Sequence, residues 1–131
     1  SYFPELMETT DRKSILCADL DRVEEVVATL TNARVTIQKS FKTVDSSKRE
    51  ILQKYLLAID AKMIWARVKP LALKAVYGEG TVTESGAKVA KELEQWFYYY
   101  KQEWRKVSKE GDLGKISAVV FWYADLIRKL G

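Results

Sequence analysis

Apolar residues recur every three or four positions along most of the chain, which is the spacing of one face of an α-helix. The first long stretch with this spacing predicts a helix that begins near Leu20 and ends near Ser40. Its apolar face comprises Leu20, Val23, Val27, Leu30, Ala33, Ile37 and Phe41. A shorter helical segment from Asp11 to Ala18 precedes it. No segment alternates strictly between apolar and polar residues with hairpin turns at both ends, so we expect no β-sheet.

The next stretch predicts a long helix that runs toward Tyr77. Ser47 followed three residues later by Glu50 is a capping-box pattern, which places the start of this helix there. The helix has two apolar faces. One comprises Leu52, Tyr55, Leu56, Ile59, Met63 and Ala66, and the other comprises Leu57, Ala61, Ile64, Trp65 and Val68. A helix of this kind is either central or covered by something outside the chain. Pro70 lacks a backbone N–H, so we expect the helix to be kinked or split near Pro70.

Two further helices are predicted in the C-terminal half. The stretch from Gly78 to Gly86 is the clearest loop, and Thr83 or Ser85 can cap the helix that follows it. The core face of that helix comprises Val89, Leu93, Trp96, Tyr100, Trp104 and Val107, with Tyr98 on the opposite side. A break from Gly111 to Gly114 separates it from the last helix. The core face of the last helix comprises Leu113, Ile116, Val120, Tyr123, Ile127 and Leu130. The sequence thus predicts an all-α bundle of four to five helices, forming a single domain over residues 1–131.

Composition limits the chemistry available to this domain. The chain has 131 residues, of which 47% are hydrophobic and 31% charged, a balance typical of a globular fold. It contains no histidine, which excludes His-based catalytic triads and His-containing zinc sites. The single cysteine, Cys17, cannot form an internal disulfide, and its apolar neighbours predict a buried, inert thiol. Neither Glu24 and Glu25 nor Glu92 and Glu94 have the spacing of a facing carboxylate pair, so we expect no catalytic, cofactor or metal site.

Charge and hydropathy give expectations about partners and compartment. The net charge is +4, and the basic residues are dispersed among acidic ones, which makes nucleic acid an unlikely partner. No run of about 18 apolar residues is present, so we expect no membrane partner. The lone cysteine slightly favours a reducing compartment, the cytoplasm, although compartment stays open. Because the sequence starts at Ser1 without a methionine, we expect a fragment of a longer protein.

Some large apolar residues fall off the predicted core faces. An apolar surplus of this kind marks an interface, unless a fifth helix covers it. The candidate interface residues are Leu57, Ile64, Trp65, Tyr98, Phe121 and Trp122.

Two segments near the C-terminus resemble the end of bacterial family 20 glycoside hydrolases, the β-N-acetylhexosaminidases. They are residues 96–110 (WFYYYKQEWRKVSKE) and residues 120–128 (VFWYADLIR). The family pattern has a Tyr- and Trp-rich helix that closes with Trp-Arg and Ser-Lys, and then a last helix with Trp-Tyr, an acidic residue and Leu-Arg. Gly111, Asp112 and Gly114 depart from this pattern, which has Ser, Glu and a larger residue there.

The resemblance implies a parent enzyme with an α/β barrel and an adjacent Asp-Glu catalytic pair. This chain contains no Asp-Glu dipeptide, so the resemblance makes it the helical C-terminal domain of such an enzyme. Its function would be that of a noncatalytic accessory domain, which packs on the catalytic barrel of the same chain or mediates homodimer formation. The alternative is a free-standing helical binding module for protein or nucleic acid.

Overall fold

The computed structural model describes residues 12–17, 20–107 and 113–131. Its elements are α2 (Arg12–Cys17), a 3-10 helix η1 (Leu20–Arg22), α3 (Val23–Ser40), α4 (Ser46–Tyr77), α5 (Gly86–Val107) and α6 (Leu113–Arg128). Within these described residues there is no β-strand. The predicted all-α bundle is therefore confirmed.

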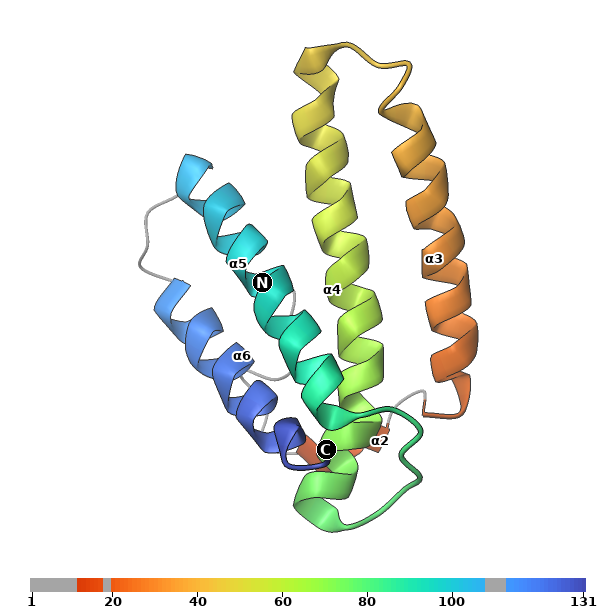
Figure 1. The fold of residues 1–131 in the computed structure, drawn as a ribbon, viewed down its shortest axis with the longest axis vertical. Helices are drawn as coiled ribbons and strands as arrows, with labels where there is room; N and C mark the ends of the chain where they lie inside the picture. The colour runs from red at the N-terminus through yellow and green to blue at the C-terminus, as the bar shows by residue number, and fades with distance from the viewer. Residues whose placement is uncertain (1–11, 18–19, 108–112) are drawn as a thin grey trace.

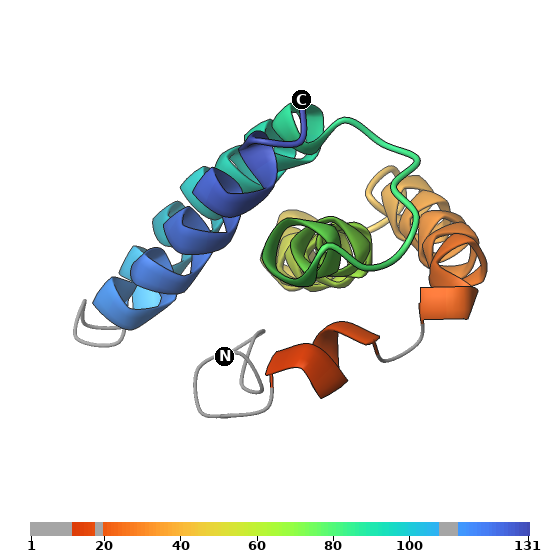
Figure 2. The same cartoon turned by 90° about the horizontal axis from the view of Figure 1, so that it is seen from below.

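Helix α4 is the centre of the bundle. It contacts α2, α3, α5 and α6. Figure 1 shows α3 along one side of α4 and the antiparallel pair α5 and α6 along the other, and Figure 2 shows α2 lying across the lower part of α4. The two apolar faces of α4 thus pack against different helices, α3 on one side and the α5 and α6 pair on the other. None of the helices that the structure describes has an apolar stretch long enough to cross a lipid bilayer.

The assignment of the two faces of α4 needs one correction. We expected Ile64 to lie off the core, but its side chain is only 8% exposed and belongs to the hydrophobic core. The buried residues of α4 are Ala61, Ile64, Val68, Leu71, Ala72 and Leu73. The other stripe, which includes Ile59 and Met63, is only partly buried. The sequence shows that two stripes exist but not which one meets the paired helices α5 and α6.

The ends of α4 are set by Asp45 and Gly78. The N-cap is Asp45 rather than Ser47, and the Ser47 hydroxyl lies 2.9 Å from the Asp45 carboxylate. Gly78 closes the helix in the left-handed conformation, with φ of 70°, and its N–H donates to the Lys74 carbonyl at 3.0 Å. Between these ends the helix is continuous through Pro70, so it is not split there. A kink at this residue stays a prediction.

The α5 and α6 pair forms much of the core. Ser85 is the cap that the sequence offered for α5, because its hydroxyl accepts a hydrogen bond from the Lys88 N–H at 3.2 Å. Phe97 was not placed on the predicted core face, yet it is only 1% exposed. Gly114 lies inside α6 rather than in the break before it, and residues 108–112 lie outside the described part of the chain.

Short helix α2 closes the lower end of the bundle. Leu16 is 1% exposed and joins the core, whereas Cys17 is exposed, so the predicted burial of the thiol is wrong. Successive helical residues point about 100° apart, so the neighbours Leu16 and Cys17 lie in different surroundings. Lys13 forms an ion pair with Glu79 at 2.8 Å and lies 5.4 Å from the ring centre of Tyr77, which ties α2 to the end of α4.

Candidate functional site

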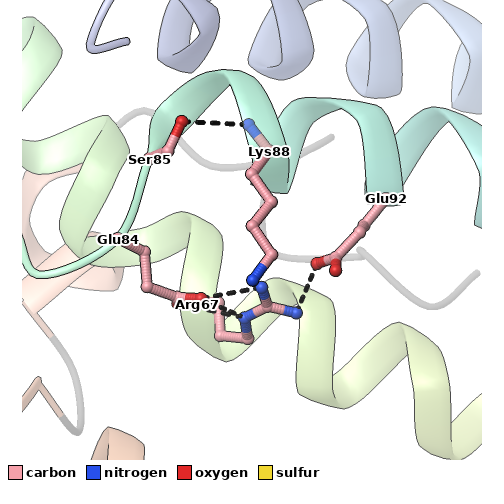
Figure 3. Close-up of polar contacts among 5 residues, drawn as sticks. All are labelled: Arg67, Glu84, Ser85, Lys88 and Glu92. Carbon is pink, nitrogen blue, oxygen red and sulfur yellow. Dashed lines mark hydrogen bonds and ion pairs between the residues drawn. The ribbon is translucent and has the colours of Figure 1, made fainter.

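A cluster of charged side chains surrounds Arg67, in the second half of α4 (Figure 3). Its Nε and Nη2 atoms donate to the Glu84 carboxylate at distances of 3.0 and 2.7 Å. Its Nη1 atom lies 2.6 Å from Oε2 of Glu92. The Arg67 side chain is 17% exposed, so these contacts form in a partly desolvated position. One guanidinium thus connects α4 to the loop before α5 and to α5 itself.

This cluster fixes the charge of Arg67. The hydrogen bonds that Arg67 donates to Glu84, followed by the contact with Glu92, raise the pKa of the guanidinium above its ordinary value, against the opposing effect of burial. Figure 3 also shows the Lys88 side chain extending from α5 toward the same cluster. The carboxylates of Glu84 and Glu92 therefore face a permanent cation, which favours a structural or binding role over proton transfer.

A second ion pair joins α3 to α4. Arg34 donates from Nε to Oδ1 of Asp60 at 2.8 Å and from Nη2 to Oδ2 at 3.4 Å, which is a fork-like arrangement. Their side chains are 35% and 28% exposed. Arg34 and Asp60 are separated by 26 residues in the sequence, so this pair depends on the packing of the two helices.

The ion pairs Arg34–Asp60 and Arg67–Glu92 line the same pocket, which lies between α3, α4 and α5. We call it the mixed pocket. Its volume is about 350 Å³. Apolar side chains of α4 and α5 form part of its lining, namely Leu57, Met63, Ile64 and Trp96. Its polar lining comprises Arg34, Asp60, Arg67, Glu92 and Gln95, with Tyr99 beside them. The Trp96 indole N–H donates to the Leu57 carbonyl at 2.9 Å, which fixes one wall of the pocket.

A second, mainly apolar groove of about 360 Å³ lies between α3 and α4. Val23, Val26 and Leu30 contribute from α3, and Trp65 and Ala66 from α4. Four charged residues also line it, namely Arg22, Glu25, Lys62 and Lys69. This groove holds fewer opposed donors and acceptors than the mixed pocket.

The six predicted interface residues do not form one surface. Tyr98, Phe121 and Trp122 are exposed, at 56%, 41% and 44%, as expected for residues off the core faces. Leu57 and Trp65 are partly buried and pack against the core, and Ile64 belongs to it.

Ring contacts separate these residues further. Trp65 and Trp122 both meet the ring of Tyr123 edge-on, at centroid distances of 5.2 and 4.7 Å. Phe121 instead meets the ring of Phe97 edge-on at 5.9 Å. The exposed Phe121 and Trp122 therefore lie against two different buried rings, and Tyr98 instead meets the exposed ring of Tyr99.

The carboxylates that the sequence analysis considered as pairs, Glu24 with Glu25 and Glu92 with Glu94, do not share a common partner within the described part of the chain. Glu92 contacts Arg67, whereas Glu94 contacts Arg128, and Glu25 lies 3.5 Å from Arg22. Among the residues that the structure describes, no three His, Cys, Asp or Glu side chains are grouped closely enough to hold a metal ion. Each of the three carboxylates Glu25, Glu92 and Glu94 is thus held in its own ion pair with an arginine.

No protein family, no curated protein and no solved structure matches this chain. The resemblance to family 20 glycoside hydrolases therefore has no support beyond the sequence itself.

Two of the predicted interface residues, Leu57 and Ile64, line the mixed pocket, but sequence reasoning missed the charged residues Arg34, Asp60 and Arg67. Arg34, Asp60 and Arg67 each stand beside apolar positions of an amphipathic helix, which is the one signal that they lie at a helix–helix boundary. Their partners are distant in sequence, so the pairing itself could not be read from spacing along a single helix.

Proposed function

We propose that this chain is a noncatalytic helical docking domain, which packs on the catalytic barrel of a family 20 glycoside hydrolase or mediates dimer formation by that enzyme. The observation that carries this proposal is the exposure of aromatic side chains within the two segments that resemble the family. Exposed Tyr and Phe side chains are enriched at protein interfaces because they bury much area with few rotatable bonds.

Packing within the bundle accounts for many residues of those segments. Tyr100 and Tyr123 are buried, and Arg128 bonds Asp125 at 2.8 Å and also contacts Glu94. It leaves Tyr98 and Phe121 56% and 41% exposed, although Phe121 also meets the ring of Phe97 edge-on. We call these two residues the docking pair, because each presents an aromatic ring on the surface of the α5 and α6 layer.

The first test asks whether the chain has catalytic activity of its own. We expect no turnover of a chromogenic N-acetylglucosaminide, since the chain lacks the Asp-Glu dipeptide that the resemblance implies. Turnover that survives repurification and disappears on mutation of this chain would contradict the proposal.

The second test measures docking directly. The chain is mixed with a family 20 catalytic domain encoded in the same genome, and the mass of the complex is measured by light scattering after size exclusion. We expect a stable complex that the double variant Tyr98→Ser and Phe121→Ser weakens at least tenfold.

The matched control replaces Ile51 and Tyr55 by Ser. These residues are 54% and 58% exposed on α4, so the control removes a similar apolar surface elsewhere. Equal weakening by both variants, or no complex with the unmodified chain, would contradict the docking proposal.

A further inference from the structure

We propose that the mixed pocket binds a neutral polyhydroxy ring compound, such as a pyranose or a cyclitol. The proposal goes beyond docking and uses other residues, since neither Tyr98 nor Phe121 lines the pocket. Its volume of about 350 Å³ falls within the range of small-molecule sites, about 300–1,000 Å³.

The equal numbers of positive and negative groups in the pocket lining disfavour a ligand that carries a net charge. The lining contains two guanidinium groups, Arg34 and Arg67, and two carboxylates, Asp60 and Glu92, so its formal charge is zero. An anionic ligand would be placed beside two carboxylates, and a cationic ligand beside two guanidinium groups. Each would have a like charge close by in a partly desolvated site, which is unfavourable. A neutral ligand avoids both repulsions.

The charged residues next to the pocket lining do not change its net charge of zero. Glu84 adds a negative charge behind Arg67, and the Lys88 side chain extends toward the same cluster in Figure 3 and adds a positive one. The cluster with these two residues included is again formally neutral.

The polar groups suit hydroxyl groups in particular. A hydroxyl both donates and accepts, so it can bridge a guanidinium and a carboxylate that are already paired. Arg34 uses Nε and Nη2 for Asp60, which leaves its Nη1 donors for a ligand. Because each partner is held by the other, the donors and acceptors are oriented before the ligand arrives, which lowers the entropy cost of binding.

The apolar lining suits the C–H faces of a ring. Tyr99 lines the pocket and is 59% exposed, so much of its ring is accessible for stacking although it meets the ring of Tyr98 edge-on. Met63 and the buried Trp96 supply further apolar surface. A linear polyol would present no comparable flat face to Tyr99.

The experiment compares three probes that share one ring and differ in charge: glucose, glucuronate and protonated glucosamine. Each is titrated into the isotopically labelled chain and followed by heteronuclear NMR. The indole N–H of Trp96 is a convenient reporter because it donates to Leu57 at the pocket wall. We expect glucose to bind with a Kd on the order of 1 mM, a value typical of so small a ligand. The two charged probes should bind at least tenfold more weakly.

Two variants test the role of charge and of stacking. Asp60→Asn leaves the shape nearly unchanged but gives the lining a net positive charge, so it should reverse the preference and make glucuronate bind more tightly than glucose. Tyr99→Ala should weaken glucose binding at least fivefold. Tyr55→Ala is the matched control, since Tyr55 is 58% exposed and lies outside the pocket lining.

Three results would overturn the proposal: no shift of pocket resonances with glucose, an unmodified chain that prefers a charged probe, or an Asp60→Asn variant with unchanged preference. The Tyr98 ring meets that of Tyr99 edge-on at 5.5 Å, so glucose binding is measured with Tyr98 intact and docking is tested with the Tyr98 and Phe121 variant. The two proposals can therefore fail separately.

Discussion

Gly86, the first residue of α5, lies directly against the backbone carbonyl of Ile127 near the end of α6. A Cβ atom built on Gly86 would lie 1.8 Å from the Ile127 oxygen and 2.9 Å from its carbonyl carbon. Real Cβ atoms do not approach backbone atoms so closely. The absence of a side chain at Gly86 therefore permits the close approach of these two helix ends.

Gly86→Ala is expected to destabilise the domain by at least about 2 kcal/mol, because backbone rather than a flexible side chain would have to move. Gly114→Ala is the control, since nothing lies within 4 Å of a Cβ at that position in α6. In an open helical position Ala is favoured over Gly by up to about 1 kcal/mol. Urea unfolding should thus give opposite signs for the two variants, and equal effects would contradict the close approach.

Phe97 and its neighbour Tyr98 should differ sharply in their contribution to stability. Phe97 is 1% exposed in the core, and Phe97→Ala should lower the free energy of unfolding by about 3–5 kcal/mol. Tyr98 is 56% exposed, so Tyr98→Ala should cost less than about 1 kcal/mol. Thermal melts of both variants measure this difference. A large loss with Tyr98→Ala would show that its ring supports the fold, and would weaken its assignment to the docking pair.

Arg67 and Glu84 should be energetically coupled more strongly than an exposed ion pair. A double-mutant cycle with Arg67→Met and Glu84→Gln should give a coupling of about 1–2 kcal/mol, because the pair is partly desolvated and bonded through two guanidinium nitrogens. The pair of Lys106 and Glu103, three residues apart on α5, should give a much smaller coupling in the same cycle, because the Lys106 side chain is 53% exposed. Similar couplings would mean that the Arg67 cluster does not hold the helices together.

Lys13 gives a prediction for high pH. Its hydrogen bond and charge interaction with Glu79 raise the pKa of the Lys13 amine above its ordinary value near 10.5. The stabilising contact is therefore complete below that ordinary pKa and is lost as the pH rises through the raised one. An NMR titration should show a lower pKa for the Lys13 amine in Glu79→Gln than in the unmodified chain. Identical titration curves would exclude the contact in solution.

The amino-acid pattern predicted most of the helix boundaries but not the pairing of their faces. The end of α3 at Ser40, the end of α4 before Gly78 and the cap at Ser85 are local features, since each depends on residues a few positions apart. The burial of Ile64 and Phe97 depends instead on where other helices lie, and helical spacing carries no such information.

The candidate site was harder still to predict. Arg34 meets Asp60 across 26 residues, and Arg67 meets Glu84 across 17. Such contacts appear only once the helices are packed. Helical spacing alone places Phe121 off the core face of α6, and the structure leaves it 41% exposed.

Helix α3 differs from the other long helices because none of its residues is buried. Amide hydrogen exchange should therefore detect a sub-global opening in which α3 leaves α4 while the α5 and α6 layer stays folded. Since α3 carries Arg34, each such opening also removes one wall of the mixed pocket. Any ligand that contacts Arg34 must then slow amide exchange along the whole of α3, far beyond the residues that it touches.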